Sequence, residues 1–349
     1  LQAKNLSQVQ VDRKLQSPRG TIYDRNGRPL AMSVVTKSLY ADPKMIKQSP
    51  SGIAELIAPY VTMSKEDIVK SLQADTAFVW IDRMMDPEKS KAVAQLIADK
   101  NLEGLNFVEE SKRYYPNGNL AAQVLGFVGT DDKGLDGLEM VLDDELKGGI
   151  QKELVATDRK GNAIFGSVLS KYLPDKGKSV TLTIDASIQF IAERALDKAM
   201  EDTGAKHASV IVMDPKTGEI LAMANRPTYD PNHYSQGSEE DFKNIAVTNL
   251  YEPGSTFKPI IASAALASGK WKLDQVYNDK GSFAANGHVM QNWNGEGYGP
   301  VRLIDILKFS INTGMAEIGT TTGADILSKY VRNYGFGSKT GIELRWYLI

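Results

Sequence analysis

An apolar, alanine-rich run at residues 260–267 is the feature that most constrains how this 349-residue chain can fold. The run follows a Pro253-Gly254 break and stops shortly before Gly269. Because Pro and Gly interrupt helices and Gly favours their C-terminal ends, the pattern predicts a buried helix that starts at or beside Ser255. We expect the second half of the chain to be organised around this helix.

Ser255 and Lys258 stand three residues apart at the start of the predicted helix. Residues with this spacing share a helix face, so a hydroxyl is expected beside an amine. A serine becomes a useful nucleophile only next to a base, and a desolvated lysine can serve as one. The helix N-terminus favours an alkoxide and disfavours a protonated lysine. An N-cap serine followed by a surface lysine would give the same pattern.

A second polar group, Ser310-Ile311-Asn312, is enclosed by apolar residues on both sides. Buried polar side chains need hydrogen-bond partners, and a closed groove shared with Ser255 and Lys258 would supply them. Ser-x-x-Lys occurs with Ser-x-Asn-type and Lys-Thr-Gly motifs in penicillin-binding proteins and serine β-lactamases. At these residues the chain resembles that family.

Three strings extend the resemblance over the first half of the chain. Residues 19–31, with an Asn26-Gly27 hairpin signal, resemble the motif that opens the non-catalytic domain of class B penicillin-binding proteins. Residues 113–118 and 134–139 look like two further boxes of that domain, and residues 158–161 follow them. Their common order makes a chance match a poor explanation.

The second half shows the local signals of a mixed domain. Residues 180–184 alternate as a strand, and Asp185 can cap a helix that ends at Gly204. Residues 209–213 and 218–223 flank a turn and should pair as antiparallel strands. This order, followed by the alanine-rich helix, is similar to the transpeptidase domain of the same family.

The resemblance implies an α+β fold with two domains. A mixed pedestal domain of the dimerisation type is expected over residues 1–170, and a penicillin-binding transpeptidase domain, with helices flanking an antiparallel sheet, over residues 171–349. Residues 172–178 would link them. Lys339-Thr340-Gly341 spells the third family box, but it lies where the family has a glycine-rich loop. We therefore interpret it as a loop.

Both chain ends are expected to be incomplete by comparison with the family. By this comparison, the true third box and the C-terminal part of the transpeptidase domain are expected to be missing before Ile349. The chain also begins at Leu1 and contains no stretch of membrane-spanning length, so an anchor helix is expected to precede it.

The implied activity is that of a peptidoglycan D,D-transpeptidase of the division or sporulation type, which crosslinks stem peptides through a serine acyl-enzyme and binds penicillin. Four residues would be catalytic: the nucleophile Ser255, the base Lys258, the proton relay Ser310 and the orienting amide Asn312. The resemblance also assigns substrate contacts to Thr256, Asn312, Thr313 and Gly314.

The implied partners are peptidoglycan stem peptides or their lipid-linked precursor, β-lactams, a membrane-embedded glycan polymerase and divisome-type proteins. The catalytic domain would lie at the outer face of the cytoplasmic membrane. No cofactor is implied. The chain has no cysteine and three scattered histidines, which gives no zinc-site pattern, and a net charge of -2 gives no electrostatic case for nucleic acid.

Two alternatives remain open at this point. Without the third box, the chain could be a catalytically inactive scaffold of the cell-wall machinery. It could also be a β-lactamase or β-lactam sensor, which shares Ser-x-x-Lys and Ser-x-Asn. Class A β-lactamases, however, use Ser-Asp-Asn with a deacylating glutamate. Here Ile311 stands in the middle position, and the long leader at residues 19–161 fits neither of those classes.

Overall fold

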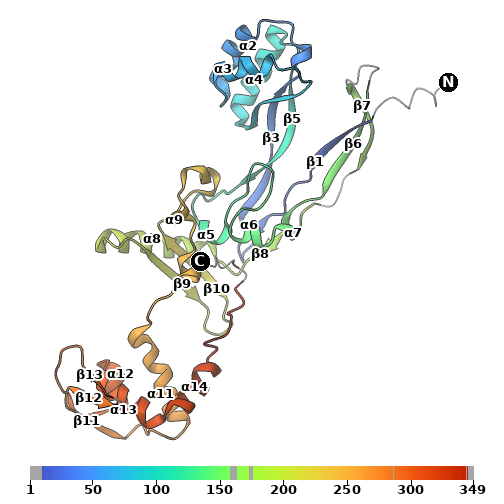
Figure 1. The fold of residues 1–349 in the computed structure, drawn as a ribbon. Helices are drawn as coiled ribbons and strands as arrows, with labels where there is room; N and C mark the ends of the chain where they lie inside the picture. The colour runs from blue at the N-terminus through green and yellow to red at the C-terminus, as the bar shows by residue number, and fades with distance from the viewer. Residues whose placement is uncertain (1–9, 158–162, 173–175, 286, 343, 345–349) are drawn as a thin grey trace. The chain divides into compact units, whose positions relative to one another are not determined.

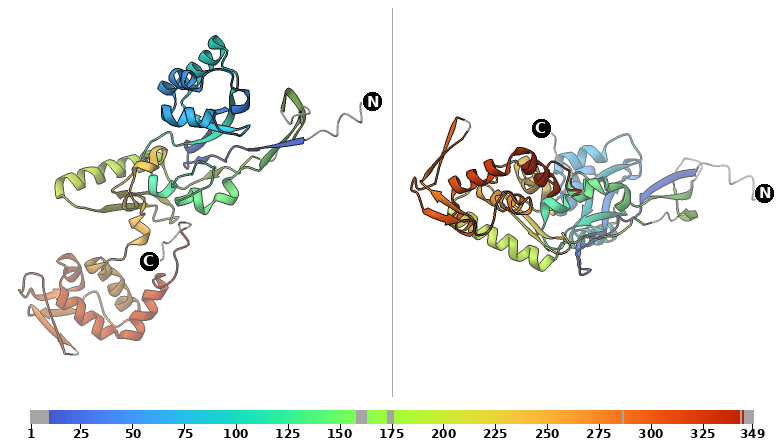
Figure 2. Two further views of the ribbon diagram at one scale, coloured as in Figure 1. Left: turned by 45° about the horizontal axis from the view of Figure 1, so that its top comes forward. Right: turned by 90° about the horizontal axis from the view of Figure 1, so that it is seen from below.

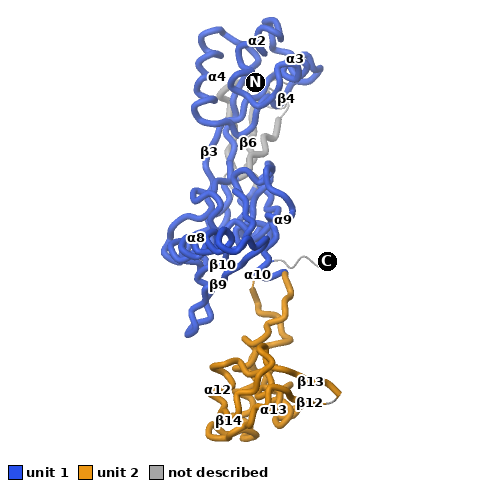
Figure 3. The backbone as a smooth tube through the Cα atoms, turned by 90° about the vertical axis from the view of Figure 1, so that its left-hand side faces the viewer, with its two compact units in different colours: residues 1–248, 343–349 blue, residues 249–342 orange. Residues whose placement is uncertain are grey.

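The computed structural model describes residues 10–157, 163–172, 176–285, 287–342 and 344. The chain divides into two compact units, residues 1–248 with 343–349 and residues 249–342, which Figure 3 colours separately. Both units contain helices and strands, which confirms the α+β fold class. Residues 158–161 and part of the predicted linker lie outside the described residues. The predicted boundary after residue 170 stays a prediction.

The first unit is built on a five-stranded sheet in which β3 pairs with three other strands. The predicted hairpin at Asn26-Gly27 is confirmed, since β2 pairs with β3 in antiparallel register. Asp24 closes the turn by accepting hydrogen bonds from the backbone N–H groups of Asn26 and Arg28, both at 2.8 Å. The strands are β2 (Ile22–Tyr23), β3 (Pro29–Ala41), β4 (Val79–Met85), β5 (Leu105–Tyr114) and β8 (Val180–Thr181).

Three helices gather at one end of the long strands β3 and β5, drawn in blue to cyan in Figures 1 and 2. They are α2 (Pro50–Ile57), α3 (Lys65–Leu72) and α4 (Pro87–Lys100). Their apolar faces and the strands form one buried cluster that includes Leu39, Ile53, Ile57, Ile68 and Ile81. Two short 3-10 turns, η1 (Pro43–Met45) and η2 (Ala58–Tyr60), connect this part of the chain.

A second antiparallel sheet has the strand order β1-β6-β7, with β1 at Gln10–Gln16, β6 at Ile150–Thr157 and β7 at Ala163–Tyr172. Short helices precede β6: α5 (Ala122–Leu125), α6 (Gly137–Val141) and α7 (Asp143–Leu146). The fully buried carboxylate of Glu139 on α6 accepts hydrogen bonds from Arg19 and Arg113, both at 2.6 Å. The three strings that resemble the pedestal boxes therefore meet at one buried ion network.

In the rest of the first unit the predicted helix and antiparallel strand pair are confirmed, whereas the strand expected at residues 180–184 covers only β8, residues 180–181. Asp185 caps α8 (Ala186–Thr203) by accepting from the N–H of Ser187 at 2.9 Å, and Gly204 ends the helix with φ +66°. The strands β9 (Ala208–Met213) and β10 (Ile220–Arg226) pair antiparallel, as expected. Three short helical segments complete the unit: η3 (Pro231–Gln236), α9 (Glu239–Phe242) and α10 (Ile245–Thr248).

The second unit is organised around the alanine-rich helix, which is confirmed as α11 (Lys258–Ala267). Gly269 follows it with φ +71°. Ala262 and Ala265 of α11 pack with Trp271, Ile306, Ile311, Met315 and Ile318 in a buried cluster. The other elements are η4 (Gly254–Phe257), β11 (Val276–Asp279), β12 (Ser282–Ala285), β13 (His288–Gln291), β14 (Gly299–Arg302), α12 (Leu303–Lys308), α13 (Asn312–Thr322) and α14 (Ala324–Asn333).

Within the described residues, none of the helices combines the length and the apolar character that a bilayer span requires.

Candidate active site

Two helix starts of the second unit bring the predicted catalytic residues together. Ser255 lies in the 3-10 turn η4, and α11 begins at Lys258. Ser310 connects α12 to α13, of which Asn312 is the first residue. Ser310 has φ +53°, a left-handed conformation that costs a non-glycine residue roughly 1–3 kcal/mol. Such strain is typical of functional sites, because the surrounding structure must hold the residue in place.

The four polar side chains form one hydrogen-bonded chain. The Lys258 ammonium donates to the Ser310 hydroxyl at 2.9 Å and to the Asn312 carboxamide oxygen at 2.7 Å. It also donates to the Ser310 carbonyl at 2.8 Å. The hydroxyls of Ser310 and Ser255 are 2.9 Å apart. Ser255 thus reaches Lys258 through Ser310, whereas the helical spacing alone predicted that the hydroxyl would lie directly beside the amine.

The surroundings of Lys258 make its ammonium easier to deprotonate than that of an exposed lysine. Its side chain is half-buried, and burial lowers the pKa of the amine below the ordinary lysine value. All three of its acceptors are neutral oxygens, so no carboxylate among the described contacts compensates the charge. Its position in the first turn of α11 places it at the positive end of the helix dipole. An amine in this environment can act as a base.

The site opens onto a groove of about 330 Å³ between α11, β13 and α13. Lys258 and Asn312 form its polar edge, and its walls are mainly apolar, from Ile261, Met290 and Met315. The expectation of a closed groove is wrong for this structure. Ser255 is exposed, because the 3-10 turn that carries it lies at the surface of the unit.

A buried network that the sequence analysis missed supports Asn312 from behind. The side-chain oxygen of Asn292, a residue only 4% exposed, accepts from the backbone N–H of Asn312 at 3.0 Å and of Thr313 at 3.2 Å. These are two of the orphan donors at the start of α13. The Asn292 amide donates in turn to Asp279 at 2.7 Å and to the Glu296 carbonyl at 2.8 Å.

Asp279 is the centre of this network. Its carboxylate accepts from the Thr313 hydroxyl at 2.6 Å and from the backbone N–H groups of Gly281 and Tyr298, both at 2.9 Å. These hydrogen bonds lower the pKa of Asp279, although burial opposes them as the largest single effect. The carboxylate therefore ties the loops after β11 and before β14 to the first turn of α13.

The predicted substrate-contact residues differ in their surroundings. Thr256 is exposed, and its hydroxyl donates to the Pro253 carbonyl at 2.6 Å. Thr313 is fully buried and holds Asp279. Gly314 is buried where an added Cβ would lie 2.7 Å from the Ile306 side chain. Contacts of these residues with a substrate stay predictions, but the environments of Thr313 and Gly314 already explain their identity by packing.

Lys339-Thr340-Gly341 lies in an exposed segment outside helices and strands, which agrees with its interpretation as a loop. In the part of the chain that the structure describes, no three His, Cys, Asp or Glu side chains gather in a way that could hold a metal ion.

Two family models match the chain in the order that the sequence suggested. The penicillin-binding protein dimerisation domain matches residues 14–182, and the penicillin binding protein transpeptidase domain matches residues 208–346. Together the two matches take in both the buried ion network around Glu139 and the hydrogen-bonded chain at Ser255.

Curated relatives match nearly the whole chain. The probable peptidoglycan D,D-transpeptidase PenA of Neisseria meningitidis is 38% identical over 335 residues, which are 93% of this chain and 55% of the relative. Stage V sporulation protein D of Bacillus subtilis is 36% identical over 333 residues, 94% of this chain and 51% of the relative. The peptidoglycan D,D-transpeptidase FtsI of Escherichia coli is 30% identical over 338 residues, which are 95% of this chain and 56% of the relative.

A solved structure shares the fold. Penicillin-binding protein 2X from Streptococcus thermophilus superposes with a TM-score of 0.73 at 26% identity, covering 94% of this chain and 52% of that protein. The chain spans about half the length of the curated relatives it matches. The chain therefore belongs to the penicillin-binding protein family, with a dimerisation domain followed by a transpeptidase domain.

Proposed function

We propose that this protein is a peptidoglycan D,D-transpeptidase that works through an acyl-enzyme on Ser255. The observation that carries the proposal is the hydrogen-bonded chain from Ser255 through Ser310 to Lys258 and Asn312. A hydroxyl connected to a half-buried amine is the arrangement that nucleophilic serine catalysis requires. The names of the relatives support the choice of substrate.

In the first half-reaction the Ser255 oxygen forms a bond to the carbonyl carbon of the penultimate D-alanine of a stem peptide. The Ser255 proton moves by way of the Ser310 hydroxyl to the neutral amine of Lys258. The bond to the terminal D-alanine then breaks, and its amine takes a proton back through Ser310. The position of the Ser310 hydroxyl supports this role, because it lies 2.9 Å from both the Ser255 hydroxyl and the Lys258 amine.

In the second half-reaction the amine of a neighbouring stem peptide attacks the acyl-enzyme carbonyl. The proton that the attacking amine loses passes through Lys258 and Ser310 to the Ser255 oxygen, which leaves as a hydroxyl. A peptide crosslink thereby replaces the ester. Asn312 orients the amine of Lys258 through its carboxamide oxygen, while its amide nitrogen donates to the Gln291 carbonyl at 3.1 Å. Asn292 and Asp279 are positioning residues that fix Asn312 from the buried side.

The groove beside Lys258 would receive the stem peptide, and Thr256, Asn312, Thr313 and Gly314 belong to the segments that would border it. We further propose that the protein acts at the outer face of the cytoplasmic membrane on peptidoglycan peptides or their lipid-linked precursor. A membrane-embedded glycan polymerase and division-type proteins would be its partners. β-Lactams, which mimic the D-alanyl-D-alanine end, would acylate Ser255.

A fluorescent penicillin tests the proposal on the intact protein. Ser255→Ala should abolish labelling, whereas Ser282→Ala, an exposed serine on β12 of the same unit, should leave it unchanged. Labelling that survives Ser255→Ala would refute the assignment of the nucleophile. Rapid turnover of a chromogenic cephalosporin would instead favour a β-lactamase, and absence of any labelling would favour an inactive scaffold.

A further inference from the structure

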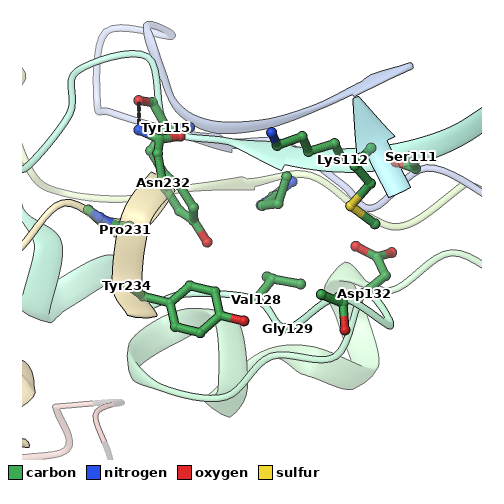
Figure 4. A pocket seen from close by; sticks show the side chains of 12 residues that line it. Ser111, Lys112, Tyr115, Val128, Gly129, Asp132, Pro231, Asn232 and Tyr234 are labelled. Carbon is green, nitrogen blue, oxygen red and sulfur yellow. Dashed lines mark hydrogen bonds between the residues drawn. The ribbon is translucent and has the colours of Figure 1, made fainter. Parts of the chain in front are cut away.

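Figure 4 shows a cavity of about 130 Å³ in the first unit, between β5, the loop at residues 128–132 and the short helix η3. Three polar atoms of its lining residues have no hydrogen-bond partner among the described residues: the Ser111 hydroxyl, Nη2 of Arg113 and Oδ2 of Asp132. All three atoms are fully buried, so a ligand in the cavity would not contact them. The free edge of strand β13, in the second unit, instead presents backbone groups that a ligand can reach.

The register of the hairpin formed by β12 and β13 shows which of its backbone groups face outward. Ala284 on β12 lies opposite Val289 on β13, and Gln291 follows two residues later. The Asn292 N–H donates to the Gly281 carbonyl at 3.3 Å, so these two residues form a hydrogen-bonded pair. Such pairs alternate along an antiparallel ladder with pairs whose N–H and C=O groups point away from each other. The backbone groups of Val289 and Gln291 therefore lie on the free edge of β13.

One of these outward groups already belongs to the candidate active site. The Gln291 carbonyl accepts from the Asn312 amide at 3.1 Å, and the Asn312 carboxamide oxygen accepts from Lys258 at 2.7 Å. The other outward groups are the N–H of Gln291 and both groups of Val289, and no group of the described residues pairs with them. The edge of β13 is therefore open, and the Asn312 side chain alone connects it to the amine of Lys258.

This edge lacks most of the features by which proteins keep edge strands from pairing. The strand β13 contains no lysine and no proline, and its register with β12 has no bulge. Its side chains face solvent, with Val289 67% exposed and Met290 44% exposed. Only its length of four residues limits pairing, which suits a short peptide better than a long strand.

The groove of about 330 Å³ beside β13 indicates what kind of peptide fits. Among the described residues that line it, Lys258 is the only charged one. The walls are otherwise mainly apolar, and they come from Met290 of β13 and from Ile261, Met315, Ala316, Gly319 and Leu327. Small, uncharged side chains match these walls, because a charged side chain would lose its hydration against them. The methyl groups of a D-alanyl-D-alanine end meet this requirement.

Outward groups two residues apart on a strand are separated by about 7 Å, which is also the spacing of alternate residues in an extended peptide. A peptide that runs along β13 can therefore pair with Val289 and Gln291 at once, as in strand addition to a sheet edge. We propose that the free edge of β13 binds the substrate peptide as an added β-strand, with its small side chains in the groove beside Lys258. This inference rests on the proposed function, because it names the part of the same site that holds the stem peptide.

The test measures binding of a stem pentapeptide, labelled with a dye at its N-terminus, to the intact Ser255→Ala protein by fluorescence anisotropy. The Ser255→Ala background prevents acylation, so only binding is observed. Val289→Pro removes one outward N–H, and proline is tolerated where an edge N–H faces solvent. Ala284→Pro is the matched control, because it removes the outward N–H of the opposite residue, on the β12 edge of the hairpin. Circular dichroism checks that both variants fold.

We expect saturable binding that Val289→Pro weakens about fivefold, as for the loss of one backbone hydrogen bond, and that Ala284→Pro leaves unchanged. The same pairing can be removed from the peptide, which leaves the protein intact. N-methylation of the two C-terminal amides of the peptide, one at a time, should weaken binding unequally, because successive amides of an extended strand point to opposite edges.

The proposal is overturned if the peptide does not bind, if both proline variants bind it equally, or if the two methylations have equal effects. A dimer of the protein that Val289→Pro dissociates in sedimentation would assign the edge to a second copy and would also overturn it. Penicillin labelling of Ser255 in the wild-type protein is measured separately and tests the proposed function, so the two failures can be told apart.

Discussion

Asn292 offers a sharp test of how the fold positions the catalytic groups. Replacing it with alanine removes the acceptor of two backbone N–H groups at the start of α13 and one donor to the buried carboxylate of Asp279. Leaving a buried polar group unsatisfied costs roughly 1–3 kcal/mol. Water can enter from the exposed hairpin side and replace Asn292 at the part-buried Glu296 carbonyl. We therefore take the lower limit for the other three groups, which gives about 3 kcal/mol.

Asn292→Ala should therefore loosen the first turn of α13, and with it Asn312 and Ser310. A displacement of about 1 Å at reacting groups can cost about 10²-fold in rate. The assay is the second-order rate constant for penicillin acylation of Ser255, with hydrogen exchange of the α13 amides as the readout of local stability. We expect a rate about 10²-fold lower and faster exchange in α13.

Asn294→Ala is the matched control. This exposed asparagine lies two residues further along the same loop, and its side-chain oxygen accepts from the Glu296 N–H at 3.1 Å. It should label at the wild-type rate. If Asn292→Ala remains folded and also acylates at the wild-type rate, the positioning role is refuted.

Three further outcomes follow from the structure. The rate of penicillin acylation should increase with pH through a midpoint below 10.5, because burial lowers the pKa of Lys258 and only its neutral amine accepts a proton. Lys258→Arg should not label at any pH. A pH-independent acylation rate would contradict the role of Lys258 as base. Glu139→Gln should destabilise the first unit by about 3–5 kcal/mol in urea unfolding, since the buried Arg19 and Arg113 lose their carboxylate partner. Glu55→Gln, which removes only an exposed ion pair with Lys65, should have little effect on stability. Gly126→Ala should prevent folding, as judged by circular dichroism, because the added Cβ would lie 1.9 Å from the backbone carbonyl oxygen of Asp136. Gly27→Ala has open space around the added Cβ and should lower the free energy of unfolding by only about 1 kcal/mol.

The elements that the sequence predicts best are those whose signals are local. Asp185 and Gly204 mark both ends of α8, because a cap acts on backbone groups within two or three residues. The hairpin at Asn26-Gly27 follows from the same kind of rule, since Asp24 bonds the turn two and four residues away. Spacing likewise predicted that Ser255 and Lys258 would belong to one site.

The parts that could not be predicted depend on contacts between distant residues. Asp279 reaches Thr313 because α13 packs against β11, which brings residues 34 positions apart into contact. Asn292 lies in the sequence Gln291-Asn292-Trp293-Asn294-Gly295, whose composition is typical of a turn and does not indicate a buried side chain. Ser310 lies between the Ser255 hydroxyl and the Lys258 amine with its backbone in the left-handed region. A serine in the sequence gives no indication of that conformation.

The proposed transpeptidation is tested most directly by incubating the intact protein with stem pentapeptides that carry a free acceptor amine. Released D-alanine and crosslinked dimer are then measured by mass spectrometry. We expect one D-alanine to be released for each crosslink formed, and neither product to appear with Ser255→Ala. Release of D-alanine without crosslinks, or crosslinks that persist in Ser255→Ala, would contradict the proposed transpeptidation.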